Sequence, residues 1–384
     1  MKVAFISLII IQLITLSISL KDEELTTFYK DYIKGLGYKL EEHKIITEDG
    51  YKLTLWHIVK SSDSAEKKVV YLQPGFICTA WVFFQLEENS LPFFLLEKGY
   101  DVWIGNSRGT IFSFEHVTKD PNDYNGDYWD FSMDENVFYD LPASIDYVKT
   151  KTKQEKIHYI GHSQGTTIFL MLYMHNPTYV ESSISSFISL GTVPSLTYTD
   201  FLPIKIIDQM YKLIEMSRPI TKAIIFGANQ RNLLAKTCQK LPHLCKYSFE
   251  AIASKGGTNR VNYAKMFLYL YYYPGGTNSN TLLHWSQIHQ EKKLVYFNPD
   301  YSENKEAVEY DIEVIKKWKI RTFIQRSDSD SFSSYDDVSK FYELIQNKSI
   351  VKLVDTPKYG HTDDLAAESA IKDVYIPILN FIEE

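Results

Sequence analysis

The stretch Ile157-His158-Tyr159-Ile160-Gly161-His162-Ser163-Gln164-Gly165-Thr166 decides the fold of this chain. Its apolar first half predicts a buried strand over 156–160, and the residues after it favour a helix over 166–174. Between the two, Gly161 to Gly165 match the pattern G-x-S-x-G, in which a strained strand-to-helix turn holds a serine hydroxyl above a sheet. Glycine is expected at both ends of the pattern because side chains there would collide with the neighbouring strand and helix. We therefore predict that Ser163 is a nucleophile, against the alternative of an ordinary glycine-rich turn.

Strands and helices alternate on both sides of this turn. Apolar runs between turn residues predict further strands at 44–47, 51–56, 69–72, 100–104, 187–190, 319–325 and 350–354. Helical periodicity predicts helices at 25–38, 90–98 and 134–149 and from about residue 365. Alternation at this spacing indicates an α/β fold, with a mostly parallel sheet and helices on both faces.

The alternation stops over residues 195–317, where apolar residues follow helical spacing and strand character is low. This stretch is too long for a plain loop. We therefore predict a core formed by residues 20–194 and 318–384, interrupted by a helical cap or lid at 195–317. The apolar face at 201–216 either opens onto a lipid surface or packs inward.

A serine hydroxyl needs a base, and the base needs an acid that orients it. In this fold the partners follow in the order Ser, acid, His. His361 is the histidine that follows the last predicted strand, on the carboxyl side where catalytic groups of parallel sheets gather. For the acid, the loop after residue 325 offers Asp328 and Asp330, and spacing does not separate them.

An oxyanion hole requires two backbone N–H groups, one from the residue after the nucleophile and one from a loop after an earlier strand. These positions predict Gln164 and Phe76 as the donors. Phe76 belongs to the loop Gln73-Pro74-Gly75-Phe76.

Charge and the N-terminus bound the environment of the chain. Its 384 residues carry 41 Lys and Arg against 48 Asp and Glu, a net charge of −7, so no basic footprint for nucleic acid is present. Residues 1–19 are typical of a secretory signal peptide, with a charged start, an apolar stretch and small residues at the end. The alternative is an uncleaved membrane anchor. No later segment has about 18 uninterrupted apolar residues, so no further span is expected.

Three cysteines allow one disulfide. Cys238 and Cys245 are the closest pair, which leaves Cys78 as a free thiol. Asn347 stands in the acceptor pattern Asn-Lys-Ser for N-glycosylation. No cluster of Cys and His has the spacing of metal ligands, so no metal site is expected.

Several longer motifs make the chain resemble the acid lipases, the family of gastric, lingual and lysosomal lipases, from about residue 25 to the C-terminus. The motifs are Thr47-Glu48-Asp49-Gly50-Tyr51, the stretch from Gly99 to Gly109, Tyr139-Asp140-Leu141-Pro142-Ala143, Gly161 to Thr167, and His284-Trp285. The resemblance implies an α/β-hydrolase fold with a helical cap.

The resemblance also implies a triad of Ser163, His361 and Asp330, because the family's acid lies seven residues before an Asp-Val pair, here Asp337-Val338. It implies Phe76 and Gln164 as oxyanion donors and hydrolysis of triacylglycerols or cholesteryl esters at a lipid–water interface, without metal or organic cofactor. The expected compartment is the secretory pathway, either secretion or the lysosomal or phagosomal lumen. Rival interpretations are a carboxylesterase, a thioesterase, a peptidase or a non-catalytic carrier of apolar ligands.

Overall fold

A mostly parallel sheet forms the centre of the computed structural model, which describes residues 23–60, 68–243, 245–247, 254 and 266–384. The predicted signal peptide at 1–19 and residues 61–67 lie outside the described residues. The described strands of this sheet are β1 (Tyr38–Ile46), β2 (Tyr51–Lys60), β3 (Val69–Gln73), β4 (Asp101–Ile104), β5 (Glu115–His116), β6 (Ile157–His162), β7 (Ile184–Leu190), β10 (Arg321–Arg326) and β11 (Val351–Asp355).

The strand order in the sheet is β1-β2-β4-β3-β6-β7-β10-β11, with β5 paired to β2. The strand that follows β3 in the chain, β4, lies on one side of β3, and β6 lies on the other side, so the order switches at β3. The strands from β4 to β11 along this order pair in parallel, and β2 is antiparallel to both β1 and β4. In open parallel sheets, ligands bind beyond the carboxyl ends of the strands at such a reversal. A functional site is therefore expected beyond the carboxyl ends of β3 and β6.

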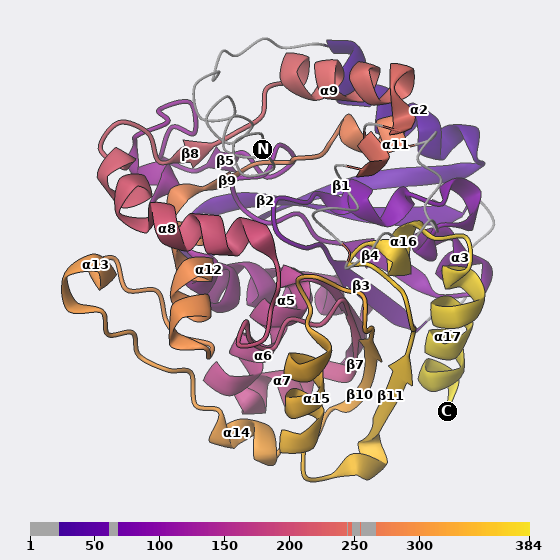
Figure 1. The fold of residues 1–384 in the computed structure, drawn as a ribbon. Helices are drawn as coiled ribbons and strands as arrows, with labels where there is room; N and C mark the ends of the chain where they lie inside the picture. Colours follow the sequence, from indigo (N-terminus) through magenta and orange to yellow (C-terminus); the bar gives the residue numbers. More distant parts are fainter. Residues whose placement is uncertain (1–22, 61–67, 244, 248–253, 255–265) are drawn as a thin grey trace.

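Helices cover both faces of the sheet, as Figure 1 shows with α3 and α17 at the right of the view and α5, α6 and α15 on the other side. Their bounds are α2 (Glu23–Gly35), α3 (Leu91–Glu97), α5 (Leu141–Thr152), α6 (Gln164–His175), α7 (Pro177–Ser183), α15 (Tyr335–Leu344), α16 (Asp363–Ala366) and α17 (Ile376–Glu383). Shorter turns are α4 (Met133–Glu135), the 3₁₀ turns Ala80–Phe84, Glu87–Asn89, Asp127–Trp129 and Lys348–Ile350, and the π-helical turns Asn136–Asp140 and Ile371–Tyr375.

The two cores follow from the period of two in the strands. In β3, Val69 and Tyr71 join the cluster that contains α5, α6 and α15, whereas Val70 and Leu72 join the cluster that contains α3 and α17. Both faces of this strand are buried, which explains its continuous apolar sequence. The predicted fold class is confirmed.

The region between β7 and β10 is mainly helical. Its described elements are α8 (Leu202–Ser217), β8 (Ala223–Ile224), α9 (Ala228–Lys240), α11 (Met266–Leu270), β9 (Thr277–Asn278), α12 (Ser279–Glu291), α13 (Tyr301–Asn304) and α14 (Glu313–Lys316). α8 packs on α12, at the left of Figure 1, and α9 packs on α11, at the top of that view. The low strand content expected here holds except for the small β8–β9 pair.

Arg108 joins two distant segments of the core. Its side chain has no exposed surface and pairs with Asp49, at 2.6 and 3.0 Å, and with Asp140, at 2.7 and 2.9 Å. Its guanidinium also lies 3.9 Å from the ring centre of Tyr51. A buried cation of this kind is tolerated because two carboxylates bind its guanidinium and the Tyr51 ring lies against one of its faces.

None of the helices that the structure describes is long and apolar enough to cross a lipid bilayer.

Candidate active site

Ser163 occupies the turn between β6 and α6. Its backbone adopts φ 55° and ψ −122°, a conformation that a residue with a side chain adopts only under strain. The Ser163 N–H donates to the carbonyl of Leu190 at 3.0 Å, and the Thr166 N–H donates to the carbonyl of Ser163 at 2.8 Å. These bonds hold the strained serine at the carboxyl end of the central strand.

The two glycines of the turn permit close backbone contacts. A Cβ at Gly165 would lie 2.3 Å from the carbonyl oxygen of Gln73, the last residue of β3. A Cβ at Gly161 would lie 2.8 Å from the Gly165 backbone at the start of α6. The steric reason for glycine thus lies in the adjacent strand and helix.

His361 lies between Ser163 and Asp330, which come from loops far apart in the chain. Its Nε2 is 2.7 Å from Ser163 Oγ, and its Nδ1 is 2.8 Å from Asp330 Oδ2. Asp330 follows β10 and His361 follows β11, so the carboxyl ends of β6, β10 and β11 supply the three side chains. With the proton on Nδ1 facing the carboxylate, Nε2 is free to accept the Ser163 hydroxyl proton.

The structure separates the two candidate acids. Asp330 is buried, and its Oδ1 accepts the N–H groups of Phe332 and Ser333, both at 2.8 Å. Asp328 is exposed, and its carboxylate accepts the N–H of Lys358 at 2.7 Å, which lowers its pKa. Asp328 therefore closes a surface turn, and Asp330 is the acid that contacts His361.

The two predicted oxyanion donors flank Ser163. Gln164 is the first residue of α6, where N–H groups have no acceptor within the helix. Phe76 follows Gly75, whose Cβ position would lie 2.8 Å from Ser163 Cβ. In the described part of the chain, neither amide N–H donates to a backbone carbonyl. Both are available to a ligand oxygen beside Ser163.

The sequence prediction missed a second buried pair beneath this site. His162 Nε2 lies 3.0 Å from the backbone carbonyl of His361 and 3.5 Å from the buried carboxylate of Asp364. Burial alone would lower the pKa of His162, but the Asp364 charge and the His361 carbonyl outweigh it, so its pKa lies above the ordinary value. The signal was present only as the second residue of G-x-S-x-G, a position that the pattern leaves unspecified.

Aromatic residues enclose the site. Phe332 packs edge-on against the His361 ring at 5.2 Å, and both Trp285 of α12 and Phe201 pack against Phe332. Only 5% of Ser163 is exposed. The hydroxyl therefore lies in a largely dry environment, where electrostatic interactions are strong.

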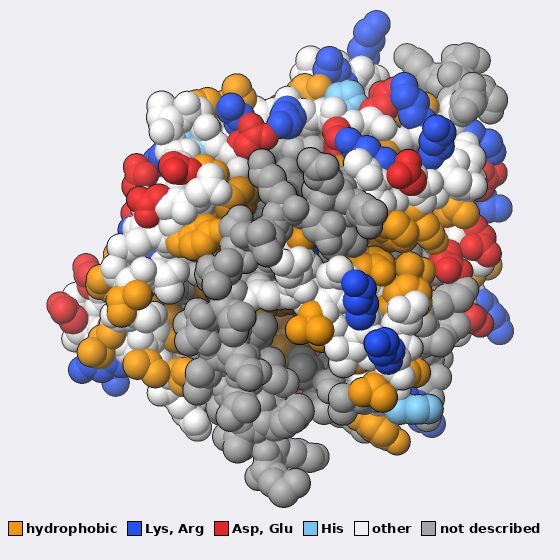
Figure 2. Space-filling model, turned by 90° about the horizontal axis from the view of Figure 1, so that it is seen from above, with side chains coloured by type: hydrophobic (Ala, Val, Ile, Leu, Met, Phe, Trp, Pro, Cys, Tyr) orange, Lys and Arg blue, Asp and Glu red, His pale blue; other side chains and the backbone are white. Residues whose placement is uncertain are grey.

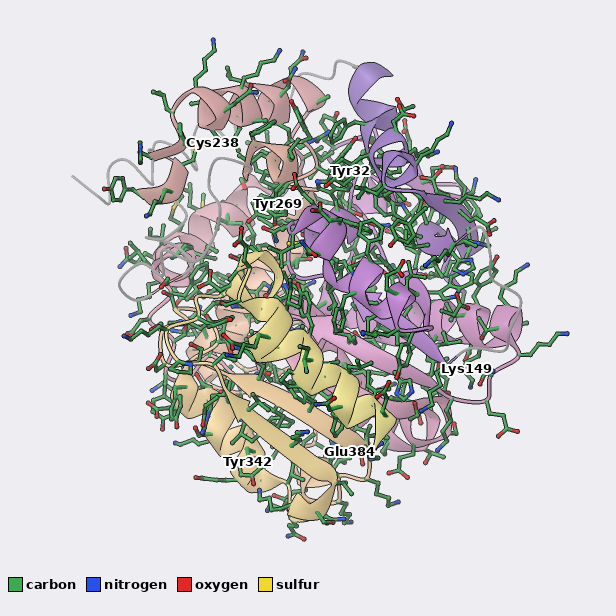
Figure 3. All side chains as sticks on the ribbon, turned by 90° about the vertical axis from the view of Figure 1, so that its right-hand side faces the viewer. Tyr32, Lys149, Cys238, Tyr269, Tyr342 and Glu384 are labelled. Carbon is green, nitrogen blue, oxygen red and sulfur yellow. A yellow bond between two sulfur atoms is a disulfide. The ribbon has the colours of Figure 1, made fainter. Side chains whose placement is uncertain are left out.

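A cavity of about 420 Å³ lies apart from the side chains of Ser163, His361 and Asp330. Its lining includes Tyr32 of α2, Trp81 and Tyr269, and Figure 3 labels Tyr32 and Tyr269 near each other at the top of the molecule. Neither Ser163 nor His361 lines it.

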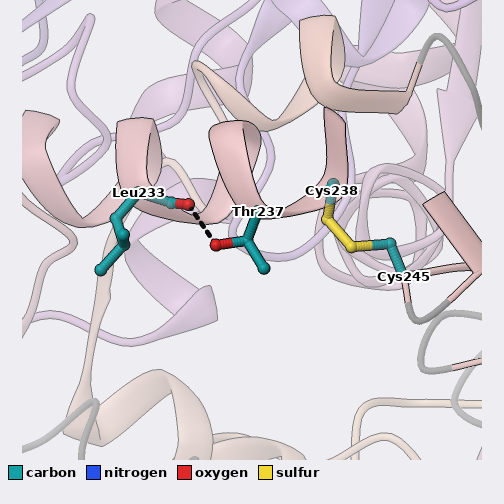
Figure 4. The surroundings of a disulfide bond; sticks show 4 residues. All are labelled: Leu233, Thr237, Cys238 and Cys245. Carbon is teal, nitrogen blue, oxygen red and sulfur yellow. Dashed lines mark hydrogen bonds between the residues drawn. A yellow bond between two sulfur atoms is a disulfide. The ribbon is translucent and has the colours of Figure 1, made fainter. Parts of the chain in front are cut away.

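Three further predictions concern covalent chemistry. Cys238 and Cys245 form a disulfide with Cα atoms 5.4 Å apart, at the end of α9 (Figure 4). The Thr237 hydroxyl donates to the Leu233 carbonyl at 2.7 Å in the same helix. Cys78 is a buried free thiol, and burial raises its pKa to about 12. Asn347 is exposed in the turn before β11, and its side-chain oxygen accepts the Ser349 hydroxyl at 2.6 Å.

Comparison with known proteins places this geometry in context. The model of the alpha/beta hydrolase fold matches residues 68–363, and a model of the partial alpha/beta-hydrolase lipase region matches residues 29–86. Lipase member K of Homo sapiens is 32% identical over 368 residues, which cover 91% of this chain and 88% of that protein. Gastric triacylglycerol lipase of Bos taurus is 32% identical over 389 residues, which cover 95% of this chain and 93% of that protein.

Solved structures agree on the fold. A thermophilic esterase from Thermogutta terrifontis superposes with a TM-score of 0.54 at 13% identity, covering 89% of this chain and 98% of that chain. An esterase from Exiguobacterium antarcticum superposes with a TM-score of 0.51 at 15% identity, covering 90% of this chain and all of that chain. At such identities the likeness concerns the fold alone.

Proposed function

We propose, from the premise that this chain belongs to the lipase family of the α/β-hydrolase fold, that Ser163, His361 and Asp330 are its catalytic triad. The chain is a carboxylic ester hydrolase of that family. The observation that carries the assignment of residues is the unbroken hydrogen-bonded path from Ser163 Oγ through the imidazole to the Asp330 carboxylate.

The proposed reaction follows the geometry of this path. His361 Nε2 takes the Ser163 proton as Oγ attacks the ester carbonyl, and Asp330 stabilises the imidazolium that forms. The N–H groups of Phe76 and Gln164 hold the oxyanion of the tetrahedral intermediate. His361 then protonates the departing alcohol, and water, activated by the same imidazole, releases the acid from Ser163.

The proposed substrates are lipid esters, namely triacylglycerols, cholesteryl esters or both. One of the relatives is named for triacylglycerol, and the apolar rings of Phe332, Trp285 and Phe201 around the serine suit a long acyl chain better than a polar substrate. No cofactor enters the proposed cycle.

Residues 195–317 are proposed to act as a cap on the core at 20–194 and 318–384. Trp285 of α12 reaches the first residue of α6, so the cap contacts the serine turn itself. Because Ser163 is buried, substrate entry requires the cap to shift.

The cap also offers apolar residues to a lipid–water interface. Within α8, Ile204 and Tyr211 are buried, whereas Leu213 and Met216 are exposed. Some apolar residues of α8 therefore pack inward, and others face outward, where they could contact a lipid surface. Figure 2, seen from above the view of Figure 1, shows further apolar side chains at the surface on this face of the molecule. Where exposed apolar residues form a contiguous patch, they mark a surface that contacts lipid or protein.

The proposed compartment is the secretory pathway, with secretion or delivery to a lysosomal or phagosomal lumen. The Cys238–Cys245 disulfide supports an oxidising compartment. The exposed Asn347 side chain is accessible for glycosylation there.

The test is hydrolysis of emulsified long-chain triacylglycerol, emulsified cholesteryl ester and a soluble short-chain ester at pH 5 and pH 8. Ser163→Ala is compared with Ser182→Ala, an exposed serine of α7. We expect activity on the emulsions that Ser163→Ala abolishes and Ser182→Ala leaves intact. Activity on the soluble ester alone would contradict the lipid assignment, and activity that survives Ser163→Ala would contradict the nucleophile.

A further inference from the structure

A cluster of metal-ligating side chains lies on the edge of the sheet, apart from the serine site. Glu41 and His43 belong to β1 and His57 belongs to β2. Glu41 pairs directly with His57 across the two strands, and His43 is two residues along from Glu41. Because side chains alternate along a strand and cross-strand partners share a face, all three point to the same side of the sheet.

The three side chains converge on one point. His43 Nε2 lies 3.7 Å and His57 Nδ1 lies 3.6 Å from Glu41 Oε2, and the three donor atoms lie within 4.8 Å of one another. Ligands around a tetrahedral zinc ion, at about 2.0–2.2 Å from it, are separated by about 3.4 Å. Shifts of a few tenths of an ångström would bring the two nitrogens to that separation from Glu41 Oε2.

The outward atoms of the cluster already have partners, which leaves the inward atoms free. His57 Nε2 is 2.6 Å from Asp101 Oδ1 on β4, and His43 Nδ1 is 3.0 Å from the Tyr147 hydroxyl on α5. Lys39 binds the other carboxylate oxygen of Glu41 at 2.6 Å. A carboxylate on the far nitrogen of a histidine is the arrangement that orients metal-binding imidazoles.

Two further observations point to a missing ligand. His43 Nε2 is buried and makes no hydrogen bond among the described residues, although it faces Glu41. The His57 ring is also held in place, because it stacks on Trp103 with centroids 4.1 Å apart and planes 7° apart. A buried imidazole nitrogen without a hydrogen bond is costly, and a cation at the common point would satisfy it.

We propose that Glu41, His43 and His57 bind a divalent transition-metal ion of the zinc type, with the fourth position open to water. Two imidazoles and one carboxylate are a donor set that zinc accepts. The site lies apart from the serine, on β1 and β2, and His57 connects it through Asp101 to β4. No ligand spacing is visible along the chain, because the donors come from two strands and meet only through the pairing register of these strands.

The test uses zinc and cobalt ions on the full chain at pH 7.5. We expect one ion per chain by calorimetric titration, the visible absorption of tetrahedral Co²⁺, and a rise in Tm of about 3 °C at a hundredfold excess over Kd. Absence of both the absorption and the Tm rise in the wild-type protein would overturn the proposal, whatever the variants do.

Variants locate the ion. His43→Gln and His57→Gln should each raise Kd at least about 100-fold, and Asp101→Asn should raise it about 10- to 100-fold by releasing the His57 ring. His175→Gln, on an exposed histidine of α6, is the matched control and should leave Kd unchanged. Unchanged binding in His43→Gln and His57→Gln would show that the ion binds elsewhere and would also overturn the proposal.

Discussion

Trp285 donates from Nε1 to the side-chain oxygen of Gln164 at 3.0 Å, which joins α12 to the residue directly after the serine. Gln164 is the proposed source of one oxyanion N–H. The indole therefore positions the turn that presents this N–H, without touching the substrate oxygen itself.

Replacement of Trp285 by Phe should lower kcat about 10-fold, less than the 10²- to 10³-fold loss that follows from removing an oxyanion donor outright. An aromatic ring is kept, so part of the contact with Phe332 remains, while the N–H donor and some ring volume are lost. The control is Trp318→Phe, which removes a buried indole donor to Ile320 and Thr322 at the start of β10. Both variants should lose similar stability, and only Trp285→Phe should lose kcat. Equal kcat in the two variants would contradict a positioning role.

Asp330→Asn should lower kcat by about 10⁴-fold, because an amide no longer selects the His361 tautomer that accepts the serine proton. Asp328→Asn is the matched control and should stay within about twofold of the wild type, since Asp328 lies at the surface, where it accepts the Lys358 N–H and the Ser329 hydroxyl. The measurement is kcat on a soluble ester, which avoids the interface. A large loss in Asp328→Asn instead would reassign the acid.

His158 should destabilise the protein in acid. Burial, reinforced by the positive charges of Lys68 and Arg321, lowers its pKa to about 4. The unfolded chain binds the proton near pH 6.5 and the folded chain only near pH 4, so stability is lost as pH falls between these values, by up to about 3 kcal/mol. Urea unfolding at pH 7.5 and 4.5 should show a smaller loss in His158→Gln than in the wild type. His175→Gln should keep the wild-type loss, and an equal loss in all three proteins would refute the assignment.

His162 should have the opposite effect on stability and stabilise the folded protein in acid. Its raised pKa means that its contribution to stability is complete below about pH 6.5 and disappears as pH rises through the folded value. Asp364→Asn removes the charge that outweighs burial, so the His162 pKa measured by NMR should change from above 6.5 to below it. An unchanged His162 pKa in Asp364→Asn would mean that the Asp364 charge does not raise it.

Much of the fold was predictable because the central strands β3, β6 and β7 are buried on both faces and are rich in apolar residues. Val69 to Leu72 illustrates this, since no exposed position interrupts it. The serine turn was also predictable, because its glycines are required by close contacts with residues of the same turn and with the end of β3. Helix boundaries were predicted less well: the helix expected at 134–149 contains the π-helical turn Asn136–Asp140 and runs on to Thr152.

Relationships that depend on three-dimensional packing were not predictable. Spacing left Asp328 and Asp330 equivalent, and only the resemblance to known lipases separated them before the structure showed which carboxylate contacts His361. The His162–Asp364 pair joins the end of β6 to α16, which are distant in sequence, and neither residue carries a spacing signal of its own.

The buried Arg108 has a consequence for how this sequence can change over time. Three of the motifs that make the chain recognisable, around Asp49, Arg108 and Asp140, meet in one ion cluster within the scaffold. Losing Arg108 would leave the buried Asp140 carboxylate and the partly buried Asp49 carboxylate without the cation that they share, at a cost of several kcal/mol. Arg108 can therefore be replaced only together with its aspartate partners. The motifs by which such a chain is recognised are thus maintained by the stability of the core as well as by the chemistry of the site.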